Sequence, residues 1–185
     1  MGQRSQIYIR YNVNGNKGMI ARYFQWNYGE RMVSRARGII EILKEQYLRY
    51  SIIWTDPKYI TKLARICDVN FDMRDIVMST DIIEEVKEFF DGDLYYLFHQ
   101  DNNDGQLLID VTDKEIKYGF IPYCDASVPL TAEKYIKWDK PRKYMDEETI
   151  AYTKENIRFI NENAELMSAE EMKEFLNADY SYLLD

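Results

Sequence analysis

Cysteine, histidine and proline are scarce in this chain of 185 residues, which contains two, one and four of them, respectively. Two cysteines, Cys67 and Cys124, are too few for a disulfide-rich framework or a four-cysteine zinc site. A single histidine, His99, excludes a multi-histidine metal centre and the metalloprotease helix motif. We therefore expect neither a metal nor a cofactor in this protein.

Long apolar runs are missing as well. No stretch approaches the roughly 18–20 residues that a membrane helix needs, and the first ten residues lack the apolar segment of a signal peptide. Hydrophobic residues still make up 46% of the chain and charged residues 30%, a composition typical of folded rather than disordered proteins. We expect a reduced, cytoplasmic protein that folds as a single globular domain over residues 1–185.

Positive charge is concentrated near the N-terminus. The chain has a net charge of −8, but residues 1–50 carry +6 and the remaining residues carry −14. The basic segment either meets an anion such as nucleic acid or packs against the acidic remainder and neutralises it. The second interpretation is favoured, because an acidic protein is a poor general binder of nucleic acid.

The first 26 residues predict a β-hairpin. Apolar and polar residues alternate over residues 5–13, a turn-forming Asn14-Gly15-Asn16 follows, and a second strand returns over residues 19–26. A three-residue loop that pairs Val13 with Lys17 makes one face of the hairpin apolar throughout. In this register, six side chains share the opposite face: Arg4, Tyr8, Arg10, Arg22, Phe24 and Trp26.

Helices and strands alternate in blocks along the rest of the chain. The patterns predict helices over residues 30–50, 56–67, 81–90, 132–137, 146–164 and from 168 onward, where Ser168 and Glu171 form a capping-box pattern. They predict a three-stranded meander over residues 94–100, 106–112 and 115–121, whereas residues 68–80 show no clear pattern. The expected fold is α+β, with an antiparallel sheet of about five strands (the hairpin plus the meander) packed against helices.

Motifs with a known chemistry are not present. The glycines at 15 and 18 lie between two predicted strands, so no helix N-terminus follows them to hold a phosphate. The acidic turn at residues 101–105 lacks the ligand spacing of an EF-hand loop, and no pair of carboxylates stands out among 32 acidic residues. Catalytic residues therefore cannot be named.

The shared face of the hairpin is the strongest candidate binding surface. Aromatic and arginine side chains are enriched at the centres of protein interfaces, so we expect a non-enzymatic module that binds a protein partner or a second copy of itself. The same side chains can alternatively stack on bases and neutralise the phosphates of single-stranded nucleic acid. A third interpretation is that helices cover both sheet faces and that the arginines pair with acidic residues.

A second candidate site lies at the junction between the hairpin and the first helix. This site consists of Asn27, Glu30 and Arg31. His99 is a fourth member if the fold brings it near these three residues. A pocket where these side chains converge would favour a small carboxylate/arginine enzyme acting on a phosphorylated or nucleotide substrate. The alternative is that Asn27 caps the helix and Glu30 stabilises its dipole.

The segments GQRSQIYIRY and ARYFQWNYGERMVSRARG resemble the start of small uncharacterised proteins from Gram-positive bacteria and their prophages. The resemblance covers about the first 40 residues. It implies a bacterial cytoplasmic protein from a mobile element, and it implies no activity and no functional residue.

Overall fold

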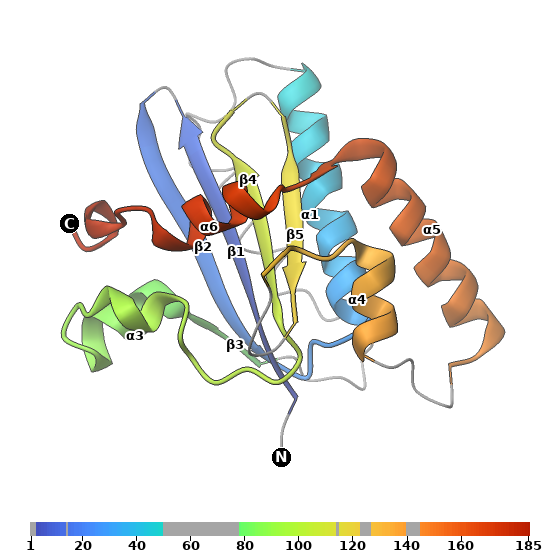
Figure 1. Cartoon of the computed structure of the whole chain (residues 1–185), viewed down its shortest axis with the longest axis horizontal. Helices are drawn as coiled ribbons and strands as arrows, with labels where there is room; N and C mark the ends of the chain where they lie inside the picture. The colour runs from blue at the N-terminus through green and yellow to red at the C-terminus, as the bar shows by residue number, and fades with distance from the viewer. Residues whose placement is uncertain (1–2, 14, 50–77, 114, 123–126, 140–144) are drawn as a thin grey trace.

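A six-stranded sheet with helices on both faces forms the centre of the computed structural model, which describes residues 3–13, 15–49, 78–113, 115–122, 127–139 and 145–185 (Figure 1). The strand order is β3-β2-β1-β4-β5-β6. The strands are β1 (Arg4–Val13), β2 (Asn16–Gln25), β3 (Met78–Asp81), β4 (Gln106–Val111), β5 (Lys117–Ile121) and β6 (Glu165–Leu166). The helices are α1 (Glu30–Arg49), α3 (Ile82–Phe89), α4 (Ala132–Asp139), α5 (Glu147–Asn163) and α6 (Ala169–Asn177), with short 3-10 helices η2 (Leu94–Leu97) and η3 (Ser181–Leu183).

The predicted hairpin is present, but its predicted register is wrong by one residue. Val13 pairs with Asn16 rather than Lys17, so the connection has two residues instead of three. Asn-Gly is the pair that two-residue hairpin turns favour, because both central positions need positive φ, and Gly15 has φ +88°. The shift places Tyr8 opposite Ala21 and Ile9 opposite Ile20.

This shift decides which side chains share a face. In the observed register, the odd positions of β1 lie on the same face as the even positions of β2. Ile9 and Phe24 therefore join the core beneath α1, whereas Tyr8 and Ala21 join a second core on the other face. The expectation of one face with Tyr8 and Phe24 side by side is wrong for this reason.

The α+β class is confirmed, but the sheet is mixed rather than antiparallel. β1 lies between β2, which is antiparallel to it, and β4, which is parallel. β5 pairs antiparallel with β4 and parallel with β6. The sheet therefore has six strands and two parallel pairings instead of the expected five antiparallel strands.

The first strand of the predicted meander is a 3-10 helix. Gly92 adopts φ +73°, and the carboxylate of Asp93 then accepts a hydrogen bond of 2.9 Å from the backbone N–H of Tyr95. This local cap starts a helical turn at Leu94, although the apolar residues of the segment also suit a strand. β4 consequently finds its neighbour in β1 rather than in the segment that precedes it.

In this chain, the helices predicted from the sequence agree with the structure better than the predicted strand pairings do. Asp81, Asp146 and Ser168 all act as N-caps, and Ser168 and Glu171 form the expected reciprocal capping box. The expected helix over residues 56–67 lies outside the described residues. Of the unassigned segment 68–80, the last three residues belong to β3 at the sheet edge.

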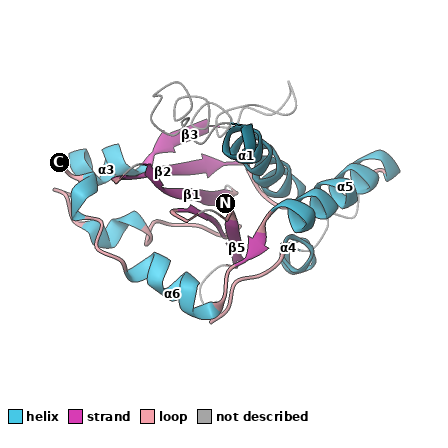
Figure 2. Cartoon of the chain, turned by 90° about the horizontal axis from the view of Figure 1, so that it is seen from above, coloured by secondary structure: helices cyan, strands magenta, loops and turns pink. Residues whose placement is uncertain are grey.

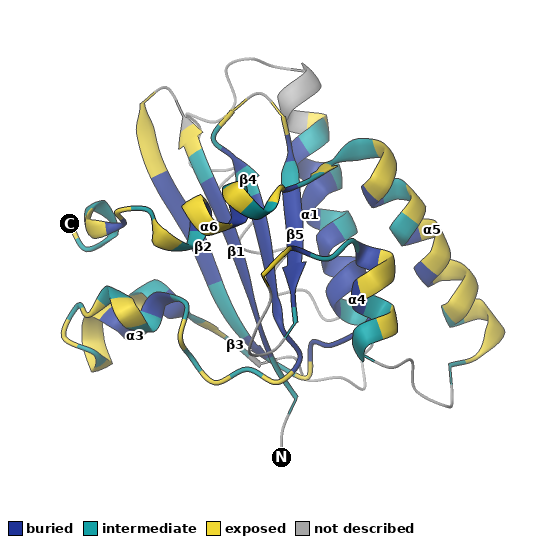
Figure 3. Ribbon diagram, viewed as in Figure 1, coloured by how far each residue is buried: buried dark blue, intermediate teal, exposed yellow. Residues whose placement is uncertain are grey.

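Helices cover both faces of the sheet, as Figure 2 shows from above. α1, α4 and α5 pack on one face around Ile9, Ile39 and Tyr135, whereas α3, α6 and the 3-10 helices pack on the other around Tyr8 and Phe175. Figure 3 shows that the central strands are buried along most of their length. In the described part of the chain, no helix has the length and apolarity needed to cross a membrane.

Candidate functional site

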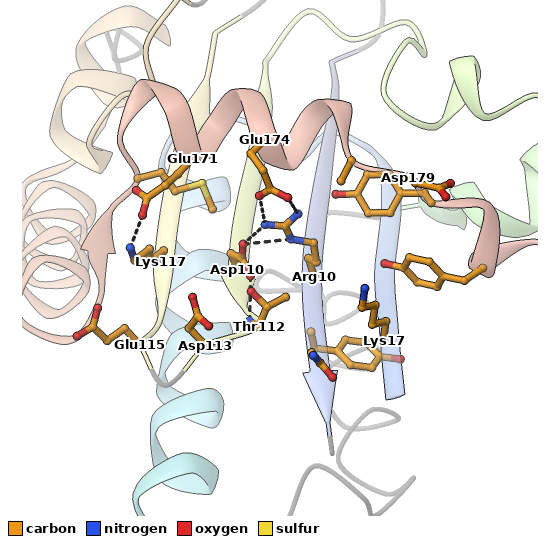
Figure 4. Close-up of a pocket in the computed structure, with 16 residues that line it drawn as sticks. Arg10, Lys17, Asp110, Thr112, Asp113, Glu115, Lys117, Glu171, Glu174 and Asp179 are labelled. Carbon is orange, nitrogen blue, oxygen red and sulfur yellow. Dashed lines mark hydrogen bonds and ion pairs between the residues drawn. The ribbon is translucent and has the colours of Figure 1, made fainter. Parts of the chain in front are cut away.

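A cavity of about 410 Å³ opens between α6 and the carboxyl ends of the parallel strands β1 and β4 (Figure 4). Its lining comes from β1, the start of β2, the connection between β4 and β5, α6 and the segment that follows α6. Ends of neighbouring parallel strands often hold binding sites, because loops diverge there and leave space.

Arg10 of β1 forms the floor of this cavity and is 9% exposed. Its guanidinium donates two hydrogen bonds to the carboxylate of Glu174 on α6, at 2.9 and 2.6 Å. It also donates from Nε to Asp110 Oδ2 of β4 at 3.1 Å, and Nη2 contacts the same oxygen. One arginine therefore joins two strands and a helix.

The surroundings of Arg10 keep it charged. Burial alone would lower the pKa of its guanidinium, but hydrogen bonds to Glu174 and Asp110 outweigh burial, and the net shift is upward. The guanidinium also lies 4.7 Å from the ring centroid of Phe175, in cation–π geometry. Burial raises the pKa of the neighbouring Tyr180 phenol above its ordinary value.

A second ion pair fixes the wall of the cavity. Lys117 of β5 forms an ion pair with Glu171, a residue of the first turn of α6. Glu171 is held in place by the capping box, in which the backbone N–H of Ser168 donates to it at 2.7 Å. The hydrogen bond from Lys117 and then that from Ser168 hold the pKa of the Glu171 carboxyl below its ordinary value.

Exposed carboxylates dominate the rim. Asp113 and Glu115 lie on the β4–β5 connection, and Asp179 follows α6. Lys17 at the start of β2 is the basic rim residue; it lies on the side of Asp179 and away from Asp113 and Glu115 (Figure 4). Across the whole lining there are three cationic and six carboxylate side chains, which give the cavity a net charge of −3.

These groups support electrostatic binding more directly than metal coordination. Within the described ranges, no group of three or more histidine, cysteine, aspartate or glutamate side chains is arranged to hold a metal ion. The wall pair of Lys117 with Glu171 is neutral, whereas the floor, with one arginine and two carboxylates, carries −1. The rim, with three carboxylates and Lys17, carries −2, so most of the negative charge of the lining lies where a ligand would enter. Aromatic rings of Tyr180 and Tyr182 lie in the same lining and can contact a cationic group.

The structure separates the six hairpin residues that were expected to share one exposed face. Arg4, Tyr8 and Arg10 lie on one face of β1, where Tyr8 is fully buried and donates to the carbonyl of Leu97 at 2.7 Å. Phe24 is fully buried on the opposite face.

The remaining two members of that set also do not join a common surface. Arg22 forms an ion pair of 3.3 Å with Asp81 across the β2–β3 pair. Trp26 follows the end of β2 with φ +67° and is 46% exposed. Helices cover both faces, so the premise of one exposed aromatic/arginine face is wrong.

The second predicted set does not converge either. Asn27 is fully buried and accepts a hydrogen bond of 2.8 Å from Arg35 Nε. Glu30 begins α1, and Arg31 donates to the carbonyl of Trp26 at 2.9 Å. His99 lines a different cavity, described below, to which neither Glu30 nor Arg31 contributes.

Sequence reasoning found one residue of the cavity, Arg10, and missed its partners. Glu174 lies 164 positions from Arg10 along the chain, and Asp110 lies 100 positions away. No local pattern marks either carboxylate among the 32 acidic residues of the chain. Only the parallel pairing of β1 with β4 brings Asp110 directly opposite Arg10.

Comparisons with known proteins add no family to these observations. No protein-family model matches the chain, and searches of curated proteins and of solved structures give no match.

Proposed function

We propose that this protein is a binding module that takes a basic segment of a partner protein into the cavity beneath α6. The observation that carries the proposal is the net charge of −3 on the cavity lining. The exposed rim carries −2 of this charge, and the floor, where Arg10 pairs with two carboxylates, carries the remaining −1.

The chemistry of the lining favours a lysine or arginine side chain as the group bound. Carboxylates accept charge-assisted hydrogen bonds from such side chains, and tyrosine rings stabilise cations that lie over their faces. Tyr182 is half-buried at the edge of the cavity, close to the exposed Asp179. An aliphatic stem can pack on the ring while the charged head meets the carboxylate.

A protein partner is preferred to nucleic acid because of the sign of the charge. The cavity and the whole chain, with a net charge of −8, repel phosphate groups. The expected class of function, contact with a protein partner, is therefore kept, but we assign it to the cavity rather than to the hairpin face. Complementary charge also speeds the encounter with a basic partner.

The proposal is tested by fluorescence anisotropy with a labelled peptide that carries four arginines separated by glycines. A peptide of the same length with glutamates in place of the arginines serves as the reference. We expect the arginine peptide to bind saturably and the glutamate peptide not to bind. Binding of the arginine peptide should weaken as the salt concentration rises from 50 to 200 mM. The double variant D113N/E115Q should bind about fivefold more weakly, from about 0.5 kcal/mol for each exposed charge.

A matched variant separates the local charge of the cavity from the net charge of the chain. E147Q/E148Q removes two exposed carboxylates from the first turn of α5, on the opposite face of the sheet. Both double variants have the same net charge, so we expect E147Q/E148Q to change the affinity less than twofold. Equal weakening by the two variants, or no binding of the arginine peptide, contradicts the proposed function.

A further inference from the structure

A second cavity, of about 430 Å³, lies between the end of β2, β3, α3 and the segment around η2. It shares no lining residue with the cavity beneath α6. Aromatic side chains form much of its wall: Tyr23 from β2, Phe90 at the end of α3, Tyr96 from η2, and His99. Its volume lies within the range of about 300–1,000 Å³ that is usual for small-molecule sites.

Two rings of this wall stack on each other, and His99 stacks on a ring outside the lining. The rings of Phe90 and Tyr96 are 4.1 Å apart at an interplanar angle of 16°. The rings of Tyr95 and His99 are also 4.1 Å apart, at 5°, and Tyr95 is 60% exposed. Phe90, Tyr96 and His99 are thus each held by a stacked neighbour, which lowers the ordering cost when these wall rings meet a flat ligand.

His99 has a defined hydrogen-bonding state. Its Nδ1 lies 2.8 Å from the carbonyl oxygen of Tyr95, and a carbonyl oxygen only accepts hydrogen bonds. Nδ1 must therefore carry the hydrogen, and in the neutral ring Nε2 is an acceptor. A ligand with an N–H or O–H group matches this acceptor.

Gln100 supplies the complementary group. It lines the cavity, and its Nε2 is buried without a hydrogen-bond partner in the described part of the chain. Buried amide groups in native proteins are nearly always paired, and a ligand acceptor would satisfy this one. The side chains of glutamine and asparagine pair with bases that present a donor beside an acceptor.

The charges around this cavity disfavour an anionic ligand. Glu85 and Asp101 both line it, and Asp101 forms an ion pair with Arg4 at its edge. One arginine paired with one of two carboxylates leaves no surplus positive charge for a phosphate. A nucleobase is planar, uncharged and carries adjacent donors and acceptors, and it stacks readily on aromatic side chains.

We propose that this cavity is a binding site for an uncharged planar heterocycle of the nucleobase class. The ring of the ligand stacks on the wall of Tyr96 and Phe90, and its polar edge meets His99 Nε2 and the amide of Gln100. This site is independent of the cavity beneath α6, and neither requires the other to be occupied.

Isothermal titration calorimetry with adenosine tests this site, with ribose and AMP as comparison ligands. We expect saturable binding of adenosine, no binding of ribose, and binding of AMP that is no tighter than that of adenosine. The variant Q100M keeps the length of the side chain and should weaken adenosine binding about fivefold to tenfold, from the loss of one buried hydrogen bond. Y96L should weaken it by a similar or larger factor, from the loss of stacking.

The control variant is Y152L, which removes an exposed tyrosine from α5 on the opposite face of the sheet. Y152L should leave the affinity for adenosine unchanged. Q100M replaces a half-buried side chain and keeps the test valid if Y96L fails to fold. Absence of adenosine binding, tighter binding of AMP, or equal loss in Y152L and Q100M overturns the proposal.

Discussion

Arg10 and Arg35 are both buried arginines, but they lie on opposite faces of the sheet in different surroundings. Arg35 of α1 is fully buried, with its guanidinium 4.9 Å from the ring centroid of Phe24 and Nε bonded to Asn27. Arg10 meets two carboxylates and lines an open cavity. Arg35 is enclosed by packed side chains, whereas Arg10 borders an open cavity that keeps charged groups next to water.

This difference separates a structural role from a binding role. Asn27, which holds Arg35, is itself fixed by Ser5 through bonds of 3.2 and 2.5 Å, so this cluster ties the start of β1 to α1. The ion pairs of Arg10 tie α6 to the sheet and at the same time shape the floor of a cavity with a charged rim. A buried charge indicates a binding site only where open space adjoins it.

The largest expected effect comes from the enclosed Arg35. Arg35→Ala should lower the free energy of unfolding by about 3–5 kcal/mol, because it leaves a large void and removes the partner of the buried Asn27. Urea denaturation followed by circular dichroism measures this change. Arg37→Ala, a partly exposed arginine on the same helix with an ion pair to Glu41, should cost about 1 kcal/mol or less. Similar losses for the two variants would contradict a structural role for Arg35.

An intermediate effect is expected at the floor of the open cavity. Arg10→Met should lower the free energy of unfolding by about 2–3 kcal/mol, because Asp110 is left partly buried without its cation. In a double-mutant cycle, Asp110→Asn should cost much less in the Arg10→Met background than in the wild type, with a coupling of about 1–3 kcal/mol. Simple additivity of the two substitutions would show that the ion pair contributes little.

The smallest effect, about 0.5–1 kcal/mol at neutral pH, is expected for Glu171→Gln at the wall of the cavity, from the loss of a partly exposed ion pair. The pKa of Glu171 is lowered in the folded protein by Lys117 and Ser168, below an unfolded value of about 4.3. Its contribution is therefore present above about pH 4.3 and is lost as the pH falls through the folded pKa. Urea denaturation from pH 7 to pH 2.5 should show the difference between wild type and Glu171→Gln disappearing in acid.

The neighbouring Glu170→Gln is the control, since it removes a carboxylate from the same first turn of α6 without touching the Lys117 ion pair. It should change the free energy of unfolding by no more than about 0.5 kcal/mol. A difference between wild type and Glu171→Gln that persists unchanged at pH 2.5 would show that this ionisation does not stabilise the fold.

Prediction from the sequence succeeded where the signal is local. The apolar stripes of residues 30–50 and 146–164 and the capping box of Ser168 each depend on residues three or four positions apart, and each helix is found in the structure. The prediction of a strand over 94–100 was wrong because it followed the apolar residues alone, whereas the carboxylate of Asp93 caps a helical turn there. The predicted hairpin register was wrong because Asn14-Gly15-Asn16 suits a loop of two residues as well as a loop of three.

The candidate sites depended almost entirely on contacts between distant segments. A shift of one residue moved Phe24 away from Tyr8, which removed the expected surface. Lys117 and Glu171 are 54 positions apart, and nothing in either neighbourhood indicates the other. The sequence marks His99 as the single histidine, but only the structure shows that it stacks on Tyr95.

The sequence by itself determined the α+β class, the hairpin and most of the described helices, because hydrophobic period and capping act over one or two turns of chain. Tertiary structure alone decided the mixed strand order, the burial of the hairpin faces and the two cavities. Those features depend on which distant strands pair, and the free energy of pairing comes from burial over the whole sheet rather than from any local run of residues.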